Sequence, residues 1–375
     1  MRDPFLQTRH RELAARVRAF GDAHLRARPT AEGDVAGESR RLARLLAKED
    51  LLAAAVLPPY GSMDLRSLVV IREGLAYFSS AADAVFATQA VGSYPVALAG
   101  TEAQRKRWLA AAAAGEVLCS LALTEPEAGS DLGGLRTLAR RENGYWRLTG
   151  VKTLISNAGV AGMYAVLARS GEAQGAKGLS MFLVDAEAPG ILVRHLEATA
   201  PQLIGEVRFE ATPALLLGEA GRGYALALAT LDTFRPGVGA AACGLAARAL
   251  DEAVSWSLGR RQFGQLLADF QATQLAIADM HTDLSGARLL VRQAAWSKDG
   301  GAARIPREGA VAQLAGTEMA IRVVDRAVEI HGGQGVVRGT TVERLYREAR
   351  SLRVWQGTNQ IQRLLIARRV FKESR

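Results

Sequence analysis

The sequence predicts an α+β protein in which helices come first, a β-domain follows and a bundle of helices ends the chain. Three observations predict this order. Apolar residues recur at helical spacing up to about residue 117, short apolar or alternating runs separated by Gly, Asn and Pro continue to about residue 222, and helical spacing then returns. The predicted domains are residues 1–117, 118–222 and 223–375.

The N-terminal domain is predicted to be helical because its Ala-, Leu- and Arg-rich blocks carry apolar residues at helical spacing. The clearest blocks are Glu38–Ala55, Leu65–Phe78 and Glu102–Ala114. Pro58-Pro59-Tyr60-Gly61 follows the first block and predicts a break, since proline and glycine interrupt helices.

The central domain is predicted to consist of strands because its apolar runs are short and are bounded by residues that favour turns. The candidate strands are Tyr145–Leu148, Met163–Ala168, Leu179–Val184, Ile191–His195 and Val207–Phe209. Asn143-Gly144 directly precedes the first of them and predicts a hairpin turn.

The C-terminal domain is predicted to be a bundle of long helices. Ile277, Met280, Leu284, Ala287 and Val291 recur at alternating steps of three and four residues. A second series with nearly the same period covers residues 311–328. Asp299-Gly300-Gly301 lies between the two series and predicts the turn that joins their helices.

The composition excludes several classes of protein. Apolar residues make up 49% and charged residues 23%, and no run of about 18 apolar residues occurs, so no transmembrane helix is expected. The first five residues have no apolar core after their charges and do not suit a secretory signal. Cys119 and Cys243 do not suggest a disulfide framework, which favours the cytoplasm. With five histidines and no Cys/His cluster, no metal site is expected.

Six short segments resemble, in order and spacing, the motifs of the acyl-CoA dehydrogenase family of flavoenzymes. They are Leu121–Asp131, Lys152–Ala158, Asp232–Pro236, Arg260–Gly264, His331–Gly335 and Arg353–Arg363. Taken alone, several have a plain structural explanation, such as a strand that enters a turn, a solvated basic pair or a glycine helix cap. The resemblance covers residues from about 10 to 370. It implies the acyl-CoA dehydrogenase fold, whose C-terminal domain is a four-helix bundle, and non-covalently bound FAD.

The resemblance implies a set of residues that bind FAD. The set is Leu121, Leu123, Thr124, Gly129, Ser130, Leu154, Ser156, Arg260, Gln262, Phe263, Gln271, Glu329, Gly332, Gly333, Thr358 and Gln360. Thr124 is expected at the pyrimidine edge of the flavin and Ser156 at its reactive nitrogen. Leu154 replaces a tryptophan that usually covers one flavin face. Arg260 and Phe263 are implied to reach the FAD of a neighbouring subunit, so a homodimer or homotetramer is expected.

The resemblance also implies the substrate site and exposes a departure from the family. Ser130, Asp232, Phe234, Trp355 and Gly357 are expected to contact substrate, and Gln356 and Arg235 occupy the catalytic positions. In most members a glutamate stands at the position of Gln356 and removes the α-proton. A minority place their glutamate at the position of Phe234. Both expected sources of a base are therefore missing.

A glutamine amide has no useful basicity, and general-base catalysis contributes about 10²–10⁴-fold to rate. Four explanations are open. The base is elsewhere, with Asp232 the nearest acidic candidate; the flavin performs other chemistry, such as oxygenation or elimination; Gln356 is an engineered Glu-to-Gln change that traps substrate; or the chain is an inactive, FAD-holding partner in a mixed oligomer.

The expected activity is FAD-dependent α,β-dehydrogenation of an acyl thioester carried by CoA or an acyl carrier protein, as in fatty acid metabolism. Electron-transfer flavoprotein or oxygen is the expected electron acceptor. The formal net charge of +9 fits a charge-rich surface or an acidic partner, such as CoA phosphates, a carrier protein or an acidic electron acceptor. Neither a membrane nor nucleic acid is expected as a partner, since the basic residues are scattered and no aromatic platform accompanies them.

Overall fold

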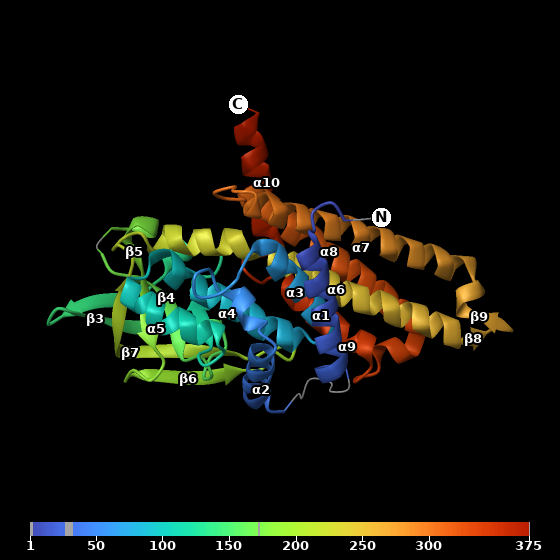
Figure 1. Ribbon diagram of the computed structural model, residues 1–375, viewed down its shortest axis with the longest axis horizontal. Helices are drawn as coiled ribbons and strands as arrows, with labels where there is room; N and C mark the ends of the chain where they lie inside the picture. Colours follow the sequence, from blue (N-terminus) through green and yellow to red (C-terminus); the bar gives the residue numbers. More distant parts are fainter. Residues whose placement is uncertain (1–2, 27–32, 172, 375) are drawn as a thin grey trace. The chain divides into compact units, whose positions relative to one another are not determined.

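The computed structural model describes residues 3–26, 33–171 and 173–374. The chain divides into two compact units. Unit 1 comprises residues 1–29, 65–83 and 232–375, and unit 2 comprises residues 30–64 and 84–231. Helical, β and helical segments follow one another in the predicted order (Figure 1). The three predicted domains, residues 1–117, 118–222 and 223–375, stay a prediction beside this division.

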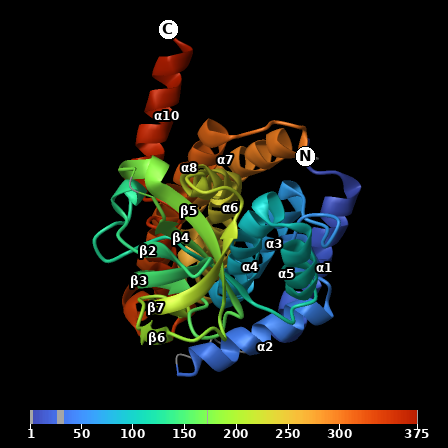
Figure 2. The same cartoon turned by 90° about the vertical axis from the view of Figure 1, so that its left-hand side faces the viewer.

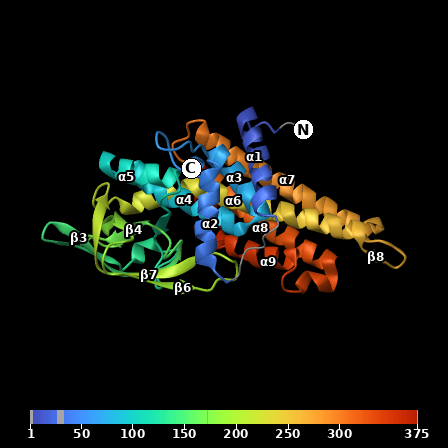
Figure 3. The ribbon, with the colours of Figure 1, turned by 60° about the horizontal axis from the view of Figure 1, so that its bottom comes forward.

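Unit 1 is built from helices, and Figure 3 shows the long helices α6 and α7 side by side. Its helices are α1 (Thr8–His24), α3 (Leu65–Phe78), most of α6 (Gly223–Gly259), α7 (Gln271–Asp299), α8 (Pro306–His331), α9 (Thr341–Leu352) and α10 (Asn359–Glu373). The short pieces are η4 (Leu267–Asp269), η5 (Gly332–Val336) and the hairpin of β8 (Arg261–Gln262) and β9 (Gln265–Leu266).

The turn after α7 lies where the sequence predicts it, and it has a second role. The last helical residue, Asp299, accepts hydrogen bonds from the backbone N–H of Leu65 (2.8 Å) and of Arg66 (3.1 Å), and so caps α3. Gly301 has a φ of 99°, a left-handed value that suits glycine. Pro306 then opens α8, a position where its missing N–H costs nothing.

Two glycines bring α6 and α8 together. A Cβ at Gly239 would lie 2.5 Å from the carbonyl oxygen of Ala312, and a Cβ at Gly316 would lie 2.7 Å from the Cα of Gly239. Real side chains do not approach so closely, so these positions admit only glycine at this helix spacing. The contact fixes the position of α8, which carries the residues that hold the closing motif.

Unit 2 contains a sheet and several helices (Figure 2). Its strands are β1 (Cys119–Ala122), β2 (Leu138–Glu142), β3 (Tyr145–Ser156), β4 (Met163–Arg169), β5 (Leu179–Asp185), β6 (Ile191–Leu196) and β7 (Ile204–Leu217). Its helices are α2 (Val35–Lys48), η1 (Leu52–Ala55), most of α4 (Ser80–Ala99), α5 (Glu102–Ala113), η2 (Leu132–Gly134) and η3 (Gly175–Gly178). The five predicted strands all lie within β3 to β7, and the prediction is confirmed.

The sheet closes on itself, because β5 pairs with both β7 and β4 while β2 joins β4 to β3. Asn143 and Gly144 make the hairpin turn with φ values of 51° and 85°, as predicted. Alternate residues of β4 enter two different apolar cores. Met163 packs in one core and Tyr164 in the other.

One predicted helix is interrupted. Glu38–Ala55 is not continuous: α2 ends at Lys48, and the short helix η1 begins at Leu52. Asp50 between them has a φ of 54°, a left-handed conformation that stops an α-helix. The apolar spacing alone did not reveal this stop, whereas Leu65–Phe78 forms α3 with the predicted bounds.

Some features set limits on the chemistry of the described residues. Cys119 and Cys243 are free and buried. Within residues 3–26, 33–171 and 173–374 no cluster of His, Cys, Asp and Glu could hold a metal ion. Across the same residues no helix combines the length and apolar character that a bilayer crossing requires.

Candidate functional site

In unit 2, the two segments predicted to hold a flavin lie side by side. The backbone N–H of Thr153 donates to the carbonyl oxygen of Thr124 (2.9 Å), and the hydroxyl of Ser120 donates to the carbonyl oxygen of Ser156 (2.7 Å). Leu121 and Leu123 belong to the first segment, and Leu154 belongs to the second. The fold therefore brings these predicted FAD-binding residues together.

A buried ion pair ties the two segments to each other. The ammonium of Lys152 is inaccessible to solvent and donates to the carbonyl oxygen of Leu123 (2.8 Å) and to the carboxylate of Glu125 (2.8 Å). Glu125 also accepts from the backbone N–H of Arg136 (2.6 Å) and of Thr137 (2.9 Å). The sequence gives only a weak signal for this pair, a lysine between Val151 and Thr153 within a strand that also carries other polar residues.

Burial and charge determine the ionisation of this pair. Burial lowers the pKa of Lys152 to about 8, against the opposing attraction of Glu125. Burial alone would raise the pKa of the Glu125 carboxyl, but the attraction of Lys152 and the hydrogen bonds outweigh it and lower the pKa. The pair is therefore charged at neutral pH, although the lysine is close to losing its proton.

The surface of the two segments presents hydroxyls, an apolar side chain and an open turn. Thr124 and Ser156 are half-buried, and neither hydroxyl has a partner among the residues that the structure describes. Leu154 has a φ of 57° and is 58% exposed, because the register of β3 shifts between Lys152 and Ile155. At Gly129 an added Cβ would meet nothing within 4 Å, and Ser130 beside it is exposed.

In unit 1, the closing motif forms a tight loop between α9 and α10. Gln356 and Gly357 both have left-handed backbones, with φ values of 50° and 100°. The hydroxyl of Thr358 accepts from the backbone N–H of Ile361 (3.4 Å) and so caps α10. Gln360 lies on the first turn of that helix and is exposed. The Oε1 atom of Gln356 is buried without a hydrogen-bond partner, so it is available to a bound group.

The segment around Asp232 also lies in unit 1, near the start of its part of α6. Asp232 is buried, and its two carboxylate oxygens pair with different guanidinium groups, those of Arg235 and Arg304. Burial lowers the pKa of the Arg235 guanidinium, and the attraction of Asp232 opposes that effect. Phe234 is 1% exposed and packs as a core residue. Both carboxylate oxygens of Asp232 are therefore already paired with cations.

The hairpin between α6 and α7 presents a cation and a phenyl ring to solvent. Phe263 is 95% exposed with a φ of 50°, and Phe270 meets it edge-on at 6.4 Å between ring centroids. The guanidinium of Arg260 has no partner in the part of the chain that the structure describes. Gln262 donates to the neighbouring carbonyl oxygen of Arg261 (2.6 Å). Gln271, the first residue of α7, is exposed.

The glycine-rich turn after α8 lies beside that hairpin. The ring of His331 stacks on Trp256 at 4.9 Å, and the carbonyl oxygen of Trp256 accepts from the backbone N–H of Arg260 (2.9 Å). Gly332 and Gly333 are open, since an added Cβ would meet nothing within 4 Å. Glu329 is paired with Arg326 at 2.7 Å on the exposed face of α8.

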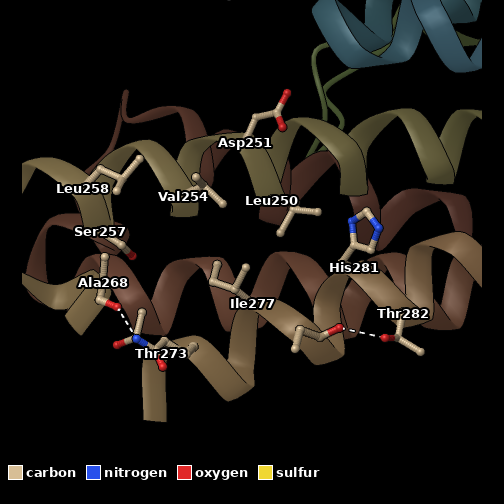
Figure 4. Close-up of a pocket in the computed structure, with 12 residues that line it drawn as sticks. Leu250, Asp251, Val254, Ser257, Leu258, Ala268, Thr273, Ile277, His281 and Thr282 are labelled. Carbon is tan, nitrogen blue, oxygen red and sulfur yellow. Dashed lines mark hydrogen bonds between the residues drawn. The ribbon is translucent and has the colours of Figure 1, made fainter. Parts of the chain in front are cut away.

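A separate cavity of about 640 Å³ lies between α6 and α7. Figure 4 shows Leu250, Val254 and Leu258 of α6 facing Ile277 of α7 across it. Asp251 points away from the cavity and accepts a hydrogen bond from the hydroxyl of Tyr77 (2.7 Å). None of the predicted site residues lines this cavity, so it is distinct from the predicted FAD and substrate positions.

The donors described above fit FAD. Two partnerless hydroxyls, those of Thr124 and Ser156, suit the polar edge of a flavin ring, and the exposed Leu154 supplies an apolar surface beside them. A guanidinium without a protein partner suits a phosphate, since its planar donors match phosphate oxygens. Open glycines beside it permit close approach of a nucleotide to the backbone.

Comparison with known proteins points in the same direction. Sequence models described as the N-terminal, middle and C-terminal domains of acyl-CoA dehydrogenase match residues 7–116, 120–212 and 221–371. The chain is 31% identical to 3-(aryl)acrylate reductase of Clostridium sporogenes over 98% of its own length and 100% of that protein.

Two further proteins are similar over most of their length. The caffeyl-CoA reductase-Etf complex subunit CarC of Acetobacterium woodii is 34% identical, with 83% of each chain covered. The solved structure of butyryl-CoA dehydrogenase from Megasphaera elsdenii matches with a TM-score of 0.91 at 29% identity, covering 98% of this chain and 99% of that one.

Proposed function

We propose, because this chain belongs to the acyl-CoA dehydrogenase family, that it is an oxidoreductase acting on the Cα–Cβ bond of an acyl thioester. Membership confirms the predicted fold and the predicted cofactor, FAD. Thr124 and Ser156 would hold the flavin ring, and Arg260 and Phe263 would hold the far end of the cofactor in a neighbouring subunit. When bound, FAD supplies the acceptor for the hydride that leaves the β-carbon.

The observation that carries the proposal is the amide of Gln356. Its Oε1 atom is buried and partnerless on a tightly turned loop, at the position where the family places its base. An amide can accept or donate a hydrogen bond and so orient a substrate, but it cannot take a proton. We therefore propose that Gln356 orients the acyl group and that the native chain dehydrogenates saturated acyl thioesters slowly.

Asp232 does not replace the missing base in this proposal. Both of its carboxylate oxygens are paired with guanidinium groups, from Arg235 and Arg304. To face an α-carbon it would have to break a buried ion pair, which is costly because the remaining charge is left uncompensated. We assign Asp232 and Arg235 to the support of the substrate site, together with Phe234.

The partners follow from the chemistry and from the relatives. We propose acyl-CoA as the substrate carrier, which the net positive charge also favours. Electron-transfer flavoprotein is the proposed redox partner, because the relative from Acetobacterium woodii is by name a subunit of a reductase-Etf complex. We propose a homo-oligomer, since Phe263 at the hairpin tip and Leu258 and Leu275 beside it are largely exposed apolar groups.

Restoring the carboxylate tests the proposal. The FAD-loaded native chain and Gln356→Glu are mixed anaerobically with butyryl- or octanoyl-CoA, and the bleaching of the visible flavin absorbance is followed by stopped flow. We expect Gln356→Glu to bleach about 10²–10⁴-fold faster, the usual contribution of a general base. Gln293→Glu, the same change at an exposed position of α7, is the matched control and leaves the rate unchanged.

Two outcomes would contradict the proposal in different ways. Equal rapid bleaching by both chains would mean that a base exists elsewhere. Absence of bleaching by both chains, although FAD stays bound, would exclude acyl-CoA dehydrogenation. Reductant-dependent oxygen uptake by the native chain would then identify oxygen chemistry on the same fold.

A second candidate function is an FAD-holding subunit that depends on an active partner chain. The combination of Gln356, a buried Phe234 and a doubly paired Asp232 favours it, because none of the three can act as a free base. Activity of the native chain that requires addition of a second family member, with no gain from Gln356→Glu alone, would support this function.

A further inference from the structure

The loop that carries Gln356 is held by one side chain of α8. Gln313 is wholly buried, and its Nε2 atom donates to the carbonyl oxygen of Trp355 (2.7 Å) and to that of Gly357 (3.1 Å). These carbonyls belong to the residues immediately before and after Gln356. One amide group therefore pins the chain on both sides of the residue in question.

We propose that Gln313 is a positioning residue, which holds residue 356 in its left-handed conformation and so fixes where the side chain at 356 presents its end group. This inference rests on the proposed function only in taking residue 356 to face the acyl group. A non-glycine residue in a left-handed conformation is costly and persists where its surroundings determine it. The two hydrogen bonds from Gln313 supply that determination.

Other contacts hold the ends of the loop and the carbonyl oxygen of Gly357, but not the carbonyl oxygen of Trp355. Glu318 of α8 accepts from Arg353 (2.9 Å) and from the side-chain amide of Asn359 (2.7 Å), which lie before and after the loop. Gln362 donates to the carbonyl oxygen of Gly357 (3.0 Å) and so duplicates one of the two bonds of Gln313. The bond to Trp355 comes from Gln313, and its loss frees the peptide that precedes Gln356.

The first test measures the loop directly by hydrogen exchange of the FAD-loaded protein, with Gln313→Met as the variant because methionine nearly keeps the shape and removes both donors. The backbone N–H groups of Val354 and Asn359 donate to the carbonyl oxygens of Ser351 (3.1 Å) and Arg353 (3.1 Å). We expect residues 353–359 to exchange at least about tenfold faster in the variant, because local opening becomes easier.

The chain offers a matched control in unit 2. Gln89 is equally buried and likewise donates to two carbonyl oxygens, those of Ala112 (2.8 Å) and Val117 (2.7 Å). Gln89→Met is expected to speed exchange around residues 112–119 and to leave residues 353–359 as in the native chain. If Gln313→Met exchanges at the native rate in residues 353–359, Gln313 does not hold the loop and the proposal is overturned.

The second test separates positioning from general stability. In the Gln356→Glu background, Gln313→Met is expected to lower kcat for acyl-CoA dehydrogenation at least about tenfold and to leave KM within about twofold. It is also expected to shift the pH dependence of kcat, which reports the ionisation of the introduced carboxyl group at position 356. Unchanged kcat and an unchanged pH profile would overturn the proposal. Faster exchange without any activity in the Gln356→Glu chain would support the clamp and count against the proposed function.

Discussion

At the scale of single residues, Lys152 and Glu125 show how a buried charge pair can join the two segments that are predicted to hold the flavin. Lys152 reaches the first segment from the second through the carbonyl oxygen of Leu123, and Glu125 reaches the backbone of Arg136 and Thr137. Buried pairs of this kind gain little net stability, since both charges lose their hydration. Their value lies in the geometry that they enforce, here the relative position of Thr124 and Ser156.

This pair predicts an unusual pH dependence of stability. The pKa of Lys152 is about 8 in the folded chain, below its value of 10.5 when exposed, so the unfolded state binds more protons between these pH values. The free energy of unfolding contributed by Lys152 therefore rises with pH from about 8 to 10.5, and is lowest below pH 8. Chemical denaturation of the native chain and of Lys152→Met across this range would measure the difference between them.

Comparing the native chain with Lys152→Met at each pH cancels the contribution of the other titrating groups, which both chains share. At pH 7 the variant is expected to be about 3–5 kcal/mol less stable, because Glu125 is left as an unpaired buried charge. Lys152→Met combined with Glu125→Gln should recover much of that loss, because an amide oxygen still accepts from the backbone N–H groups without carrying a charge. A single variant as stable as the native chain at pH 7 would mean that Glu125 is not left as an unpaired buried charge. A difference that does not change between pH 8 and 10.5 would mean that folding does not lower the pKa of Lys152.

At the scale of secondary-structure elements, the spacing of α6 and α8 depends on the missing side chains of Gly239 and Gly316. A Cβ added to Gly316 would lie 2.7 Å from the Cα of Gly239 and 2.8 Å from its carbonyl oxygen. Backbone atoms cannot rotate away as a side chain can, so the helices would have to separate. Because α8 also carries Gln313, separation of α6 and α8 would shift the hydrogen bonds that hold the loop of residues 353–358.

We predict that Gly316→Ala lowers the free energy of unfolding by about 1–3 kcal/mol, the usual cost of forcing a methyl group into a packed contact. Gly286 of α7 is the matched control, since an added Cβ there would meet nothing within 4 Å. Gly286→Ala is expected to be stabilising by up to about 1 kcal/mol, the difference in helix propensity. Urea denaturation of both variants measures the change in the free energy of unfolding. Equal changes in Gly316→Ala and Gly286→Ala would contradict the close approach of α6 and α8.

The sequence revealed these elements unevenly, for physical reasons. Helices and strands with a regular apolar period, such as Leu65–Phe78 and the runs in β4 and β5, were predicted with nearly correct bounds. The stop at Asp50 was not, since a single left-handed residue leaves no periodic signal. The motifs that resemble flavin-binding segments were found in the sequence. The bond from Lys152 that joins two of them and the bonds from Gln313 that hold the closing motif depend on contacts across the fold and could not be predicted from spacing.

At the scale of the whole molecule, the hairpin between α6 and α7 is the proposed contact with a second subunit. Arg260 presents a guanidinium without a partner among the described residues, and Phe263 is 95% exposed. Because an exposed phenyl ring loses contact with water favourably when it is covered, we expect Phe263 to contact another subunit. The partner proposed above is a second copy of this chain, whose FAD would receive Arg260.

We predict that Arg260→Ala raises the dissociation constant of FAD about 10- to 100-fold, the loss of a charge-assisted hydrogen bond of about 1.5–3 kcal/mol. Arg261 is the matched control, with the same charge on the same hairpin, because its guanidinium is already used by the carbonyl oxygen of Gly264 (3.1 Å). Arg261→Ala should keep native affinity in a fluorescence titration of the apoprotein with FAD. Equal losses in both variants would mean that only the net charge matters.

Mixed oligomers decide whether Arg260 serves the neighbouring subunit. One chain carries Arg260→Ala, and the other carries Ser156→Tyr, whose ring would fill the position expected for the flavin. If Arg260 acts on the neighbour's cofactor, a mixed dimer has one site with both defects and one with neither, so about half of its sites should hold FAD with native affinity.

If Arg260 acts within its own chain, every site carries one defect and no native affinity returns. Two differently tagged chains, purified in tandem and assayed for FAD content, distinguish these results, and the second would overturn the shared-site arrangement.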